Sequence, residues 1–170
     1  MDLKEYIRDV PDFPKKGIIF KDITTLLQSP EAFKYVIDCF IEEYKDKGIE
    51  GIVAMDARGF IFGAPLAYKM GVPFILGRKP GKLPAECVSA SYALEYGADS
   101  LEMHSDSISQ GQKILIVDDL LATGGTMSAV IELVEKLGGE IAGIAFVVEL
   151  TFIPGRQRLG DYPILSLVQY

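Results

Sequence analysis

Short apolar runs rich in β-branched residues recur through the chain. Four of them stand out, at residues 52–55, 74–76, 114–117 and 141–148. A continuous apolar run between turn residues is typical of a strand that is buried on both faces, as in a parallel sheet. These runs therefore predict four strands of a mostly parallel sheet.

Helical patterns lie before and between these runs. Residues 29–31 supply a serine N-cap, a proline for the first helical position and an acid for the first turn, and apolar residues then recur at helical spacing until Gly48. Two further helical patterns, at 60–70 and 126–137, are each followed by glycine. Alternating strands and helices predict a doubly wound α/β fold, in which ligands bind beyond the carboxyl ends of the strands.

Two segments depart from this alternation. Residues 80–107 hold Pro, Gly, Ser and isolated Glu and Tyr. This composition is too polar for a core and the segment is too long for an ordinary connection, so it predicts a mobile loop with flanking strands that can act as a lid. Residues 10–27 are punctuated by Pro11, Pro14 and Gly17, which predicts an irregular flap laid over the sheet.

Length and composition favour one compact domain over residues 1–170. The chain is 49% hydrophobic, yet no apolar run approaches the ~20 residues that a membrane-spanning helix needs. The first ten residues are charged and lack the apolar core of a signal peptide. These features predict a cytoplasmic protein that has no membrane partner.

Charge and cysteine content narrow the choice of partner. Cys39 and Cys87 lie too far apart for a zinc or redox motif, so free thiols are expected. A formal net charge of −7 repels nucleic acid overall, although a local basic patch can still hold a small phosphorylated ligand. A small molecule is the expected partner.

The most informative stretch follows the third apolar run. Asp118 and Asp119 come at the end of this strand, and the turn 122–126, Ala-Thr-Gly-Gly-Thr, leads into a helix. Adjacent strand residues point to opposite sides, so the two acids can serve different hydroxyls or a metal-bound water. Backbone N–H groups at a helix N-terminus bind anions, and glycine allows close approach. The alternative is a solvated acidic pair before an ordinary helix; neither a Walker A loop nor a dinucleotide fingerprint is present.

This combination resembles the phosphoribosyl-pyrophosphate motif of the type I phosphoribosyltransferases. The resemblance implies their α/β fold and places the ribose hydroxyls of the substrate on Asp118 and Asp119. It places the 5-phosphate on the residues of the turn: Ala122, Thr123, Gly124, Gly125 and Thr126. It also implies Mg²⁺ held mainly by substrate oxygens, with no dedicated protein ligands, in keeping with the preference of this ion for phosphate and water.

A second candidate is Arg58, at the turn that follows the first strand. A guanidinium there can pair with a pyrophosphate through its forked donors, although a structural arginine explains the pattern equally well. The stretch resembles the Ser-Arg-Gly-Phe turn of the family, with Ala57 replacing the serine. The resemblance implies that Arg58 binds pyrophosphate and takes part in catalysis.

Cations gather where the long polar segment begins, at Arg78, Lys79 and Lys82. Charge runs are usually solvated surface. In a net acidic chain, however, they are better explained as clamps for an anion, and the family places such residues on pyrophosphate.

Further along this segment, the stretch 94–97, Leu-Glu-Tyr-Gly, matches the flexible catalytic loop of the adenine-specific branch of the family. The resemblance implies a flexible loop over about residues 79–100 and catalytic roles for Glu95 and Tyr96; two exposed loop residues are the alternative. His104 has no nucleophile context and is not expected to act.

The N-terminal flap resembles the hood of the same branch, over about residues 10–27. Phe20 can stack on a purine, a contact worth ~1–3 kcal/mol, or can instead anchor the flap. Ile19 and Lys21 occupy the places whose backbone reads the base edge, and Lys21 stands where arginine is common. A site built from backbone groups rejects a base that leaves those groups unpaired.

Taken together, the resemblance implies a magnesium-dependent enzyme of purine salvage. It joins adenine to 5-phosphoribosyl 1-pyrophosphate and releases AMP and pyrophosphate, and such enzymes are usually homodimers. Two alternatives stay open: a transferase for guanine, hypoxanthine or xanthine, and an inactive sensor or transcriptional regulator on the same fold.

Overall fold

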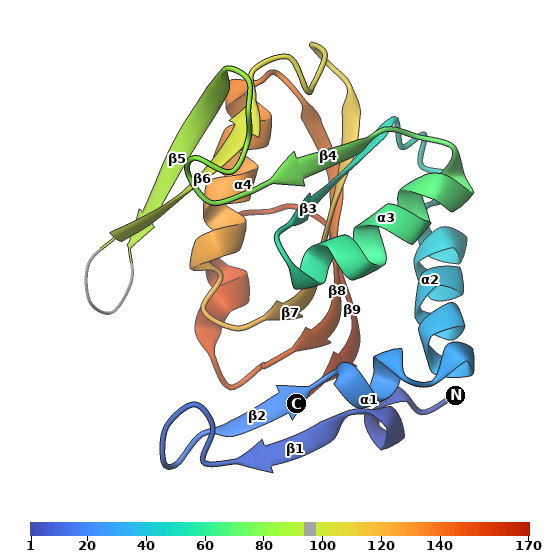
Figure 1. The fold of residues 1–170 in the computed structure, drawn as a ribbon. Coiled ribbons are helices and arrows are strands. Elements are labelled where there is room, and N and C mark those ends of the chain that lie inside the picture. Colours follow the sequence, from blue (N-terminus) through green and yellow to red (C-terminus); the bar gives the residue numbers. More distant parts are fainter. Residues whose placement is uncertain (94–97) are drawn as a thin grey trace.

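A parallel sheet forms the centre of the molecule (Figure 1). The computed structural model describes residues 1–93 and 98–170. Within them the sheet has the order β4-β3-β7-β8-β9, and every neighbouring pair is parallel. Its strands are β3 (Gly51–Met55), β4 (Phe74–Gly77), β7 (Lys113–Leu121), β8 (Glu140–Glu149) and β9 (Ile164–Gln169). The four predicted strands are confirmed, and β9 is an addition that the sequence pattern did not reveal.

Helices cover both faces of the sheet, as expected for a doubly wound fold. Alternate residues of β7 divide between the two faces: Leu115 and Val117 pack with helices α2 (Pro30–Tyr44) and α3 (Arg58–Met70), whereas Ile114 and Ile116 pack with α4 (Gly125–Lys136). Burial on both faces explains why the strands read as unbroken apolar runs.

The strand order reverses between β3 and β7. From β3 the chain moves outward to β4, and from β7 it moves the other way to β8 and β9. The connections that leave the carboxyl ends of β3 and β7 therefore diverge and open a crevice, which is where parallel α/β sheets bind ligands. The topology thus places residues after Met55 and near Leu121 at this crevice.

The N-terminal segment is a hood built on a β-hairpin. Strand β1 (Arg8–Pro11) pairs antiparallel with β2 (Ile19–Asp22); a 3₁₀ turn, η1 (Leu3–Tyr6), precedes them and a short helix, α1 (Thr24–Leu27), follows. The prediction of an irregular flap is wrong for the paired residues. The prolines and glycine that suggested it fall mainly in the connection between the two strands.

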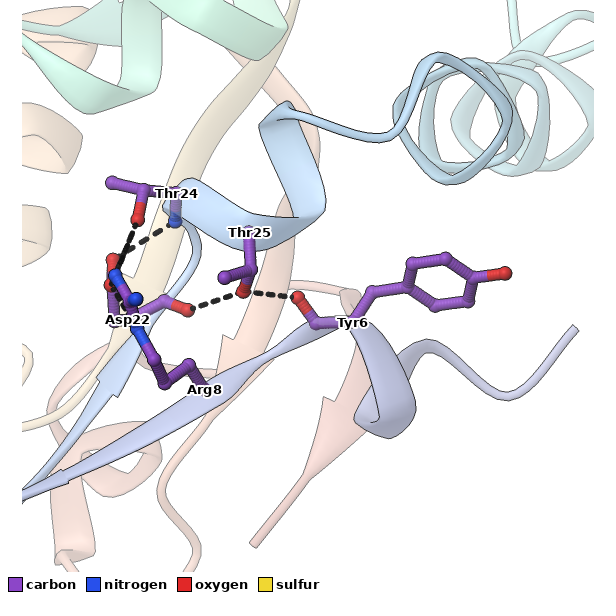
Figure 2. A network of polar contacts seen from close by, with 5 residues as sticks. All are labelled: Tyr6, Arg8, Asp22, Thr24 and Thr25. Carbon is purple, nitrogen blue, oxygen red and sulfur yellow. Dashed lines mark hydrogen bonds and ion pairs between the residues drawn. The ribbon is translucent and has the colours of Figure 1, made fainter.

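A polar network joins the hairpin to α1 (Figure 2). Arg8 donates to the Asp22 carboxylate from Nε at 3.1 Å and from Nη2 at 2.5 Å, and the backbone N–H and hydroxyl of Thr24 donate to it at 2.9 and 2.8 Å. These donors, Arg8 foremost, lower the pKa of Asp22 to about 2. The Thr25 hydroxyl donates to the Tyr6 carbonyl at 2.6 Å, so both ends of the hairpin are tied to α1.

A second hairpin supplies the flanking strands predicted within residues 80–107, and these strands take up more of the segment than the predicted loop of about residues 79–100 allows. Strand β5 (Cys87–Ala93) pairs antiparallel with β6 (Ala98–His104) and packs against α4 (Figure 1). The expectation that this segment is too polar for a core is wrong, because Ala90, Leu101 and Met103 are buried. Glu95 and Tyr96 lie outside the described residues. His104 ends β6, half-buried, and its Nε2 accepts from the Ala85 N–H at 3.3 Å.

The last connection contains a 3₁₀ turn, η2 (Pro154–Arg158), between β8 and β9. Across the described residues, no helix combines the length and the apolar character that crossing a bilayer requires.

Candidate active site

A cavity of about 240 Å³ lies at the crevice between β3 and β7. Two segments that are far apart in the sequence line it, the turn from β3 into α3 and the turn from β7 into α4. Its lining residues are Met55, Asp56, Ala57, Arg58, Asp118, Asp119, Leu120, Leu121, Ala122, Thr123, Gly124, Gly125, Thr126, Met127 and Phe146. The structure therefore brings together Arg58, the acidic pair and the whole glycine-containing turn.

The acidic pair lies inside β7, because the strand continues past it to Leu121. Asp118 is half-buried and Asp119 is only 3% exposed. Burial raises the pKa of Asp118 well above its usual value, and the neighbouring charge of Asp119 adds to this rise. Burial also raises the pKa of Asp119, while the positive charge of Arg58 opposes the rise. A ligand that supplies hydroxyl donors or positive charge would stabilise both carboxylates.

Arg58 begins α3 and faces Asp119 across the cavity. Its Nε lies 2.9 Å from Asp119 Oδ2, yet the geometry does not make a hydrogen bond, and within the described chain this buried oxygen has no hydrogen-bond partner. The guanidinium also lies over the Phe20 ring, 5.8 Å from its centroid. Arg58 thus connects the acidic pair to the hood, and its side chain is 49% exposed and open to a ligand.

The turn before α4 has the geometry of an anion site. Gly124 is the N-cap residue, with φ at +76°, and no side chain caps the helix. The N–H groups of the first helical turn lack intrahelical partners, and here they border the cavity. A non-glycine residue in this left-handed conformation would be strained. We name residues 122–126 the phosphate turn.

The phosphate turn rests against η2, a contact that the sequence pattern did not predict. A Cβ added at Gly124 would lie 2.5 Å from the Gly155 carbonyl oxygen, and one added at Gly155 would collide with the Ala122 carbonyl oxygen. The only signal in the sequence is the Pro154-Gly155 dipeptide soon after a buried strand, which marks a turn but not its contact.

The predicted cationic clamps lie outside this cavity. Arg78 donates to Asp56 Oδ2 from Nε at 2.8 Å and so reaches the cavity only through Asp56, a lining residue that the sequence reasoning missed. Lys79 pairs with Asp99, and Lys82 is exposed. The structure therefore does not place these three cations with Arg58.

Phe20 of the hood lies next to the cavity, because its ring contacts Arg58, a residue of the cavity lining. The Lys21 side chain turns elsewhere: its Nζ lies 2.7 Å from Asp9 and 3.8 Å from the centroid of the Tyr170 ring. Only the backbone of Lys21 is left to face a ligand, while Ile19 is 55% exposed. A second cavity of about 260 Å³ is lined by Val10, Phe13, Phe20 and Asp22.

The described residues offer few side chains that could bind a metal ion. In the described ranges, 1–93 and 98–170, no cluster of three or more His, Cys, Asp or Glu side chains could hold a metal ion. The cavity does offer Asp118 and the unpartnered Asp119 oxygen. These donors fit a Mg²⁺ ion only if a bound ligand and water supply most of its oxygens.

Such a crevice suits a small anionic molecule that carries hydroxyl groups, which places the protein among α/β proteins that bind phosphorylated sugars. A family model described as phosphoribosyl transferase domain matches residues 22–159. The chain belongs to the phosphoribosyltransferase family. Relatives that are 56–59% identical over all 170 residues place it, within that family, among the adenine phosphoribosyltransferases.

Relatives support this placement over the full length. Adenine phosphoribosyltransferase of Clostridium tetani is 59% identical, covering 100% of this chain and 99% of its own. The crystal structure of adenine phosphoribosyltransferase from Thermoanaerobacter pseudethanolicus gives a TM-score of 0.95 at 54% identity, over 99% of this chain and 98% of that one. The Saccharomyces cerevisiae enzyme, complexed with an imino-altritol bisphosphate and adenine, gives 0.93 at 40% identity, over 98% and 96%.

Proposed function

We propose that this chain transfers the phosphoribosyl group of 5-phosphoribosyl 1-pyrophosphate to adenine, giving AMP and pyrophosphate in purine salvage. The observation that carries the proposal is the single cavity in which the phosphate turn, the acidic pair and Arg58 meet. The adenine in the crystal of the yeast relative supports adenine as the base.

Binding of the sugar donor follows from the geometry of the cavity. The 5-phosphate accepts hydrogen bonds from the N–H groups of the phosphate turn, and Asp118 and Asp119 accept from the ribose hydroxyls. Arg58 donates to the pyrophosphate. Arg58 lies 2.9 Å from Asp119 without a hydrogen bond, so on binding pyrophosphate it exchanges an ion pair, but no hydrogen bond, for the ligand.

In the reaction, a ring nitrogen of adenine forms a bond to the anomeric carbon as the bond from that carbon to the pyrophosphate oxygen breaks. The electron pair leaves with pyrophosphate, and the proton of the attacking nitrogen passes to the Glu95 carboxylate, to which proton transfer is assigned below. Positive charge that develops on the ribose is stabilised by the acidic pair, and negative charge on the leaving group by Arg58. No covalent intermediate with the protein is needed.

Base recognition is assigned to the hood. The Phe20 ring stacks on adenine, and backbone groups of Ile19 and Lys21 bond to the base edge. The engagement of the Lys21 side chain with Asp9 and Tyr170 supports a backbone role for this residue. Because carbonyl oxygens accept from the amino group of adenine and cannot pair with the oxo group of guanine, the same contacts select the base.

Further catalytic and clamping residues are proposed on the resemblance. Glu95 and Tyr96 are assigned to proton transfer and to covering the substrate. Arg78, Lys79 and Lys82 are assigned to pyrophosphate, and this requires Arg78 to exchange Asp56, and Lys79 to exchange Asp99, for the ligand.

Magnesium, when bound, would neutralise charge on the pyrophosphate and ribose oxygens, with Asp118 and Asp119 as the protein groups nearest to it. Homodimer assembly and a cytoplasmic location belong to the same proposal and rest on the resemblance to the family.

Incubation of the pure protein with labelled adenine, 5-phosphoribosyl 1-pyrophosphate and Mg²⁺ tests the proposal. Labelled AMP is expected, and an Arg58→Met variant should lose most of it. Parallel reactions with guanine, hypoxanthine and xanthine test the choice of base. Product with guanine but not with adenine would overturn that choice, and no product with any base would favour a sensor.

A further inference from the structure

Glu149 is a buried carboxylate at the carboxyl end of β8, outside the lining of the cavity. It is 4% exposed and accepts from Arg156 twice, from Nε at 2.8 Å and from Nη2 at 2.6 Å. Ser166 Oγ donates to it at 2.6 Å and Gln169 Nε2 at 3.4 Å. The carboxylate is therefore held from both β9 and η2.

Stability alone is a weak explanation for this arrangement. A buried ion pair generally stabilises a fold no better than well-packed apolar side chains of similar volume. Its distinguishing property is geometric, because two parallel donors from a planar guanidinium fix both the position and the orientation of the arginine. The pair thus holds the short η2 turn in one place on the end of the sheet.

What η2 touches is the phosphate turn. Gly155 precedes Arg156, and its backbone lies directly against the backbone of Ala122 and Gly124. A Cβ on Gly155 would displace the phosphate turn, and a Cβ on Gly124 would displace η2. Ser128 adds a link, since its hydroxyl lies 2.9 Å from the Gly124 carbonyl and 3.3 Å from that of Arg158. The back of the phosphate turn therefore has the shape that η2 gives it.

We propose that Glu149 and Arg156 are positioning residues for the 5-phosphate site. Their ion pair presses Gly155 against the phosphate turn and so fixes the N–H groups that receive the phosphate. The inference rests on the proposed function of that turn. Neither side chain contacts the ligand, and both act through Gly155.

Calorimetric titration with two separate ligands tests this role. Ribose 5-phosphate carries the phosphate and hydroxyls but no pyrophosphate, whereas pyrophosphate with Mg²⁺ probes the Arg58 side of the cavity. Arg156→Met should weaken ribose 5-phosphate binding by roughly ten- to a hundredfold, the loss expected when one hydrogen bond to the charged phosphate is lost, and should leave pyrophosphate binding unchanged. Arg156→Lys keeps the positive charge but loses the two parallel donors of the guanidinium. Its affinity for ribose 5-phosphate should lie between that of Arg156→Met and that of the wild type.

Arg158→Met is the matched control, because Arg158 lies in the same turn and makes no ion pair with any described residue. It should bind both ligands as the wild type does. Amide hydrogen exchange gives a second readout: residues 122–126 should exchange faster in Arg156→Met, while β3 stays protected. Equal weakening of both ligands, or faster exchange throughout the sheet, would show a general structural role and overturn the inference.

If Arg156→Met does not fold, the double variant Glu149→Gln with Arg156→Met removes the fork without leaving a buried lone charge. It too should lose ribose 5-phosphate selectively, and unaltered binding would contradict the inference. Failure of the wild type itself to bind ribose 5-phosphate is a different result, because it would overturn the proposed role of the phosphate turn together with this one.

Discussion

The two adjacent acids of β7 illustrate how a functional residue can oppose folding. Burial raises the pKa of both Asp118 and Asp119, so ionisation of each is harder in the folded chain than in the unfolded chain. A carboxyl group whose pKa is higher in the folded chain contributes fully to the stability of the fold below its unfolded-state pKa. This contribution is lost as the pH rises through its folded-state pKa. At neutral pH these acids therefore destabilise the fold that holds them.

Asp118→Asn should separate stability from activity. The amide oxygen can still accept from the Asp119 N–H, as Oδ1 does now at 2.9 Å, and the buried charge is removed. We expect a gain of about 1 kcal/mol, or roughly 2–4 °C in melting temperature for a chain of this size, together with loss of AMP formation. Calorimetry and the labelled-adenine assay measure the two effects.

The control is Asp106→Asn, an exposed acid outside the cavity, which should change neither property. The stability advantage of Asp118→Asn should also shrink as the pH is lowered through the raised pKa. A less stable Asp118→Asn protein at pH 7 would contradict this account.

Among the elements, the hood is anchored in part by the Asp22 carboxylate, which accepts from Arg8 and Thr24. Asp22 has a pKa of about 2 against an ordinary 3.8, and so stabilises the hairpin fully above 3.8 and loses that contribution as the pH falls from 3.8 towards 2. Hydrogen exchange of the β2 amides should accelerate across this window in the wild type. In Asp22→Asn the same amides should exchange faster at neutral pH and change less on acidification. Identical pH profiles for the two proteins would show that Asp22 does not anchor the hood.

Comparing Gly124 with Gly111 separates the backbone strain of a positive φ from the close packing of Gly124 against Gly155. Gly124 and Gly111 have nearly equal φ values, +76° and +75°, but a Cβ at Gly111 would have nothing within 4 Å, whereas one at Gly124 would meet Gly155. Both alanine variants should lose about 1–2 kcal/mol from the left-handed backbone. Only Gly124→Ala should also lose ribose 5-phosphate binding, measured by calorimetry, and equal binding by the two variants would contradict the close packing.

Strands that bury residues on both faces, and helices with one apolar face, could be predicted from the sequence, whereas β9 and the bounds of β5 and β6 could not. The runs of β3, β7 and β8 are unbroken because helices cover both sides of them. In β9, Ser166 and Gln169 face the Glu149 carboxylate and interrupt the apolar pattern. In β5 and β6 only one side packs on α4, so Ala90 and Leu101 are separated by polar residues, and the pattern predicted strands flanking a loop but not the bounds of these strands.

Candidate site residues divide in the same way. Arg58, Asp118, Asp119 and the phosphate turn were predictable because each lies near the carboxyl end of a strand or within a few residues after it, and the fold brings carboxyl ends together. Asp56 and Gly155 were not, because their importance lies in contacts with Arg78 and with the phosphate turn, which only the folded chain defines.

At the scale of the whole molecule, the central sheet and the hood meet at Tyr170. Its backbone N–H donates to the Glu149 carbonyl at 3.0 Å, which fixes it to the end of β8, while its ring lies beside Lys21 of the hood. Strand β2 of the hood and the turn at residues 122–126 are thus both tied to the same end of β8, the first through Tyr170 and the second through Arg156 and Gly155.

Tyr170→Ala should therefore affect base binding selectively. Loss of a partly buried cation–π contact, about 0.5–2 kcal/mol, should raise the KM for adenine by roughly two- to thirtyfold, with ribose 5-phosphate affinity unchanged. Tyr68→Ala is the control, since Tyr68 is 88% exposed. Steady-state kinetics with adenine as the varied substrate makes the measurement, and an unchanged KM in Tyr170→Ala would remove the link between Tyr170 and the hood.

The contact of Gly124 with Gly155 has a consequence for inhibitor chemistry. Backbone lies directly behind the phosphate turn with no side chain between, so that wall cannot yield to a group larger than phosphate. Under the proposed function, a designed compound should keep a phosphate-sized anion there and seek its selectivity at the hood, where Phe13 and Ile19 are more than half exposed.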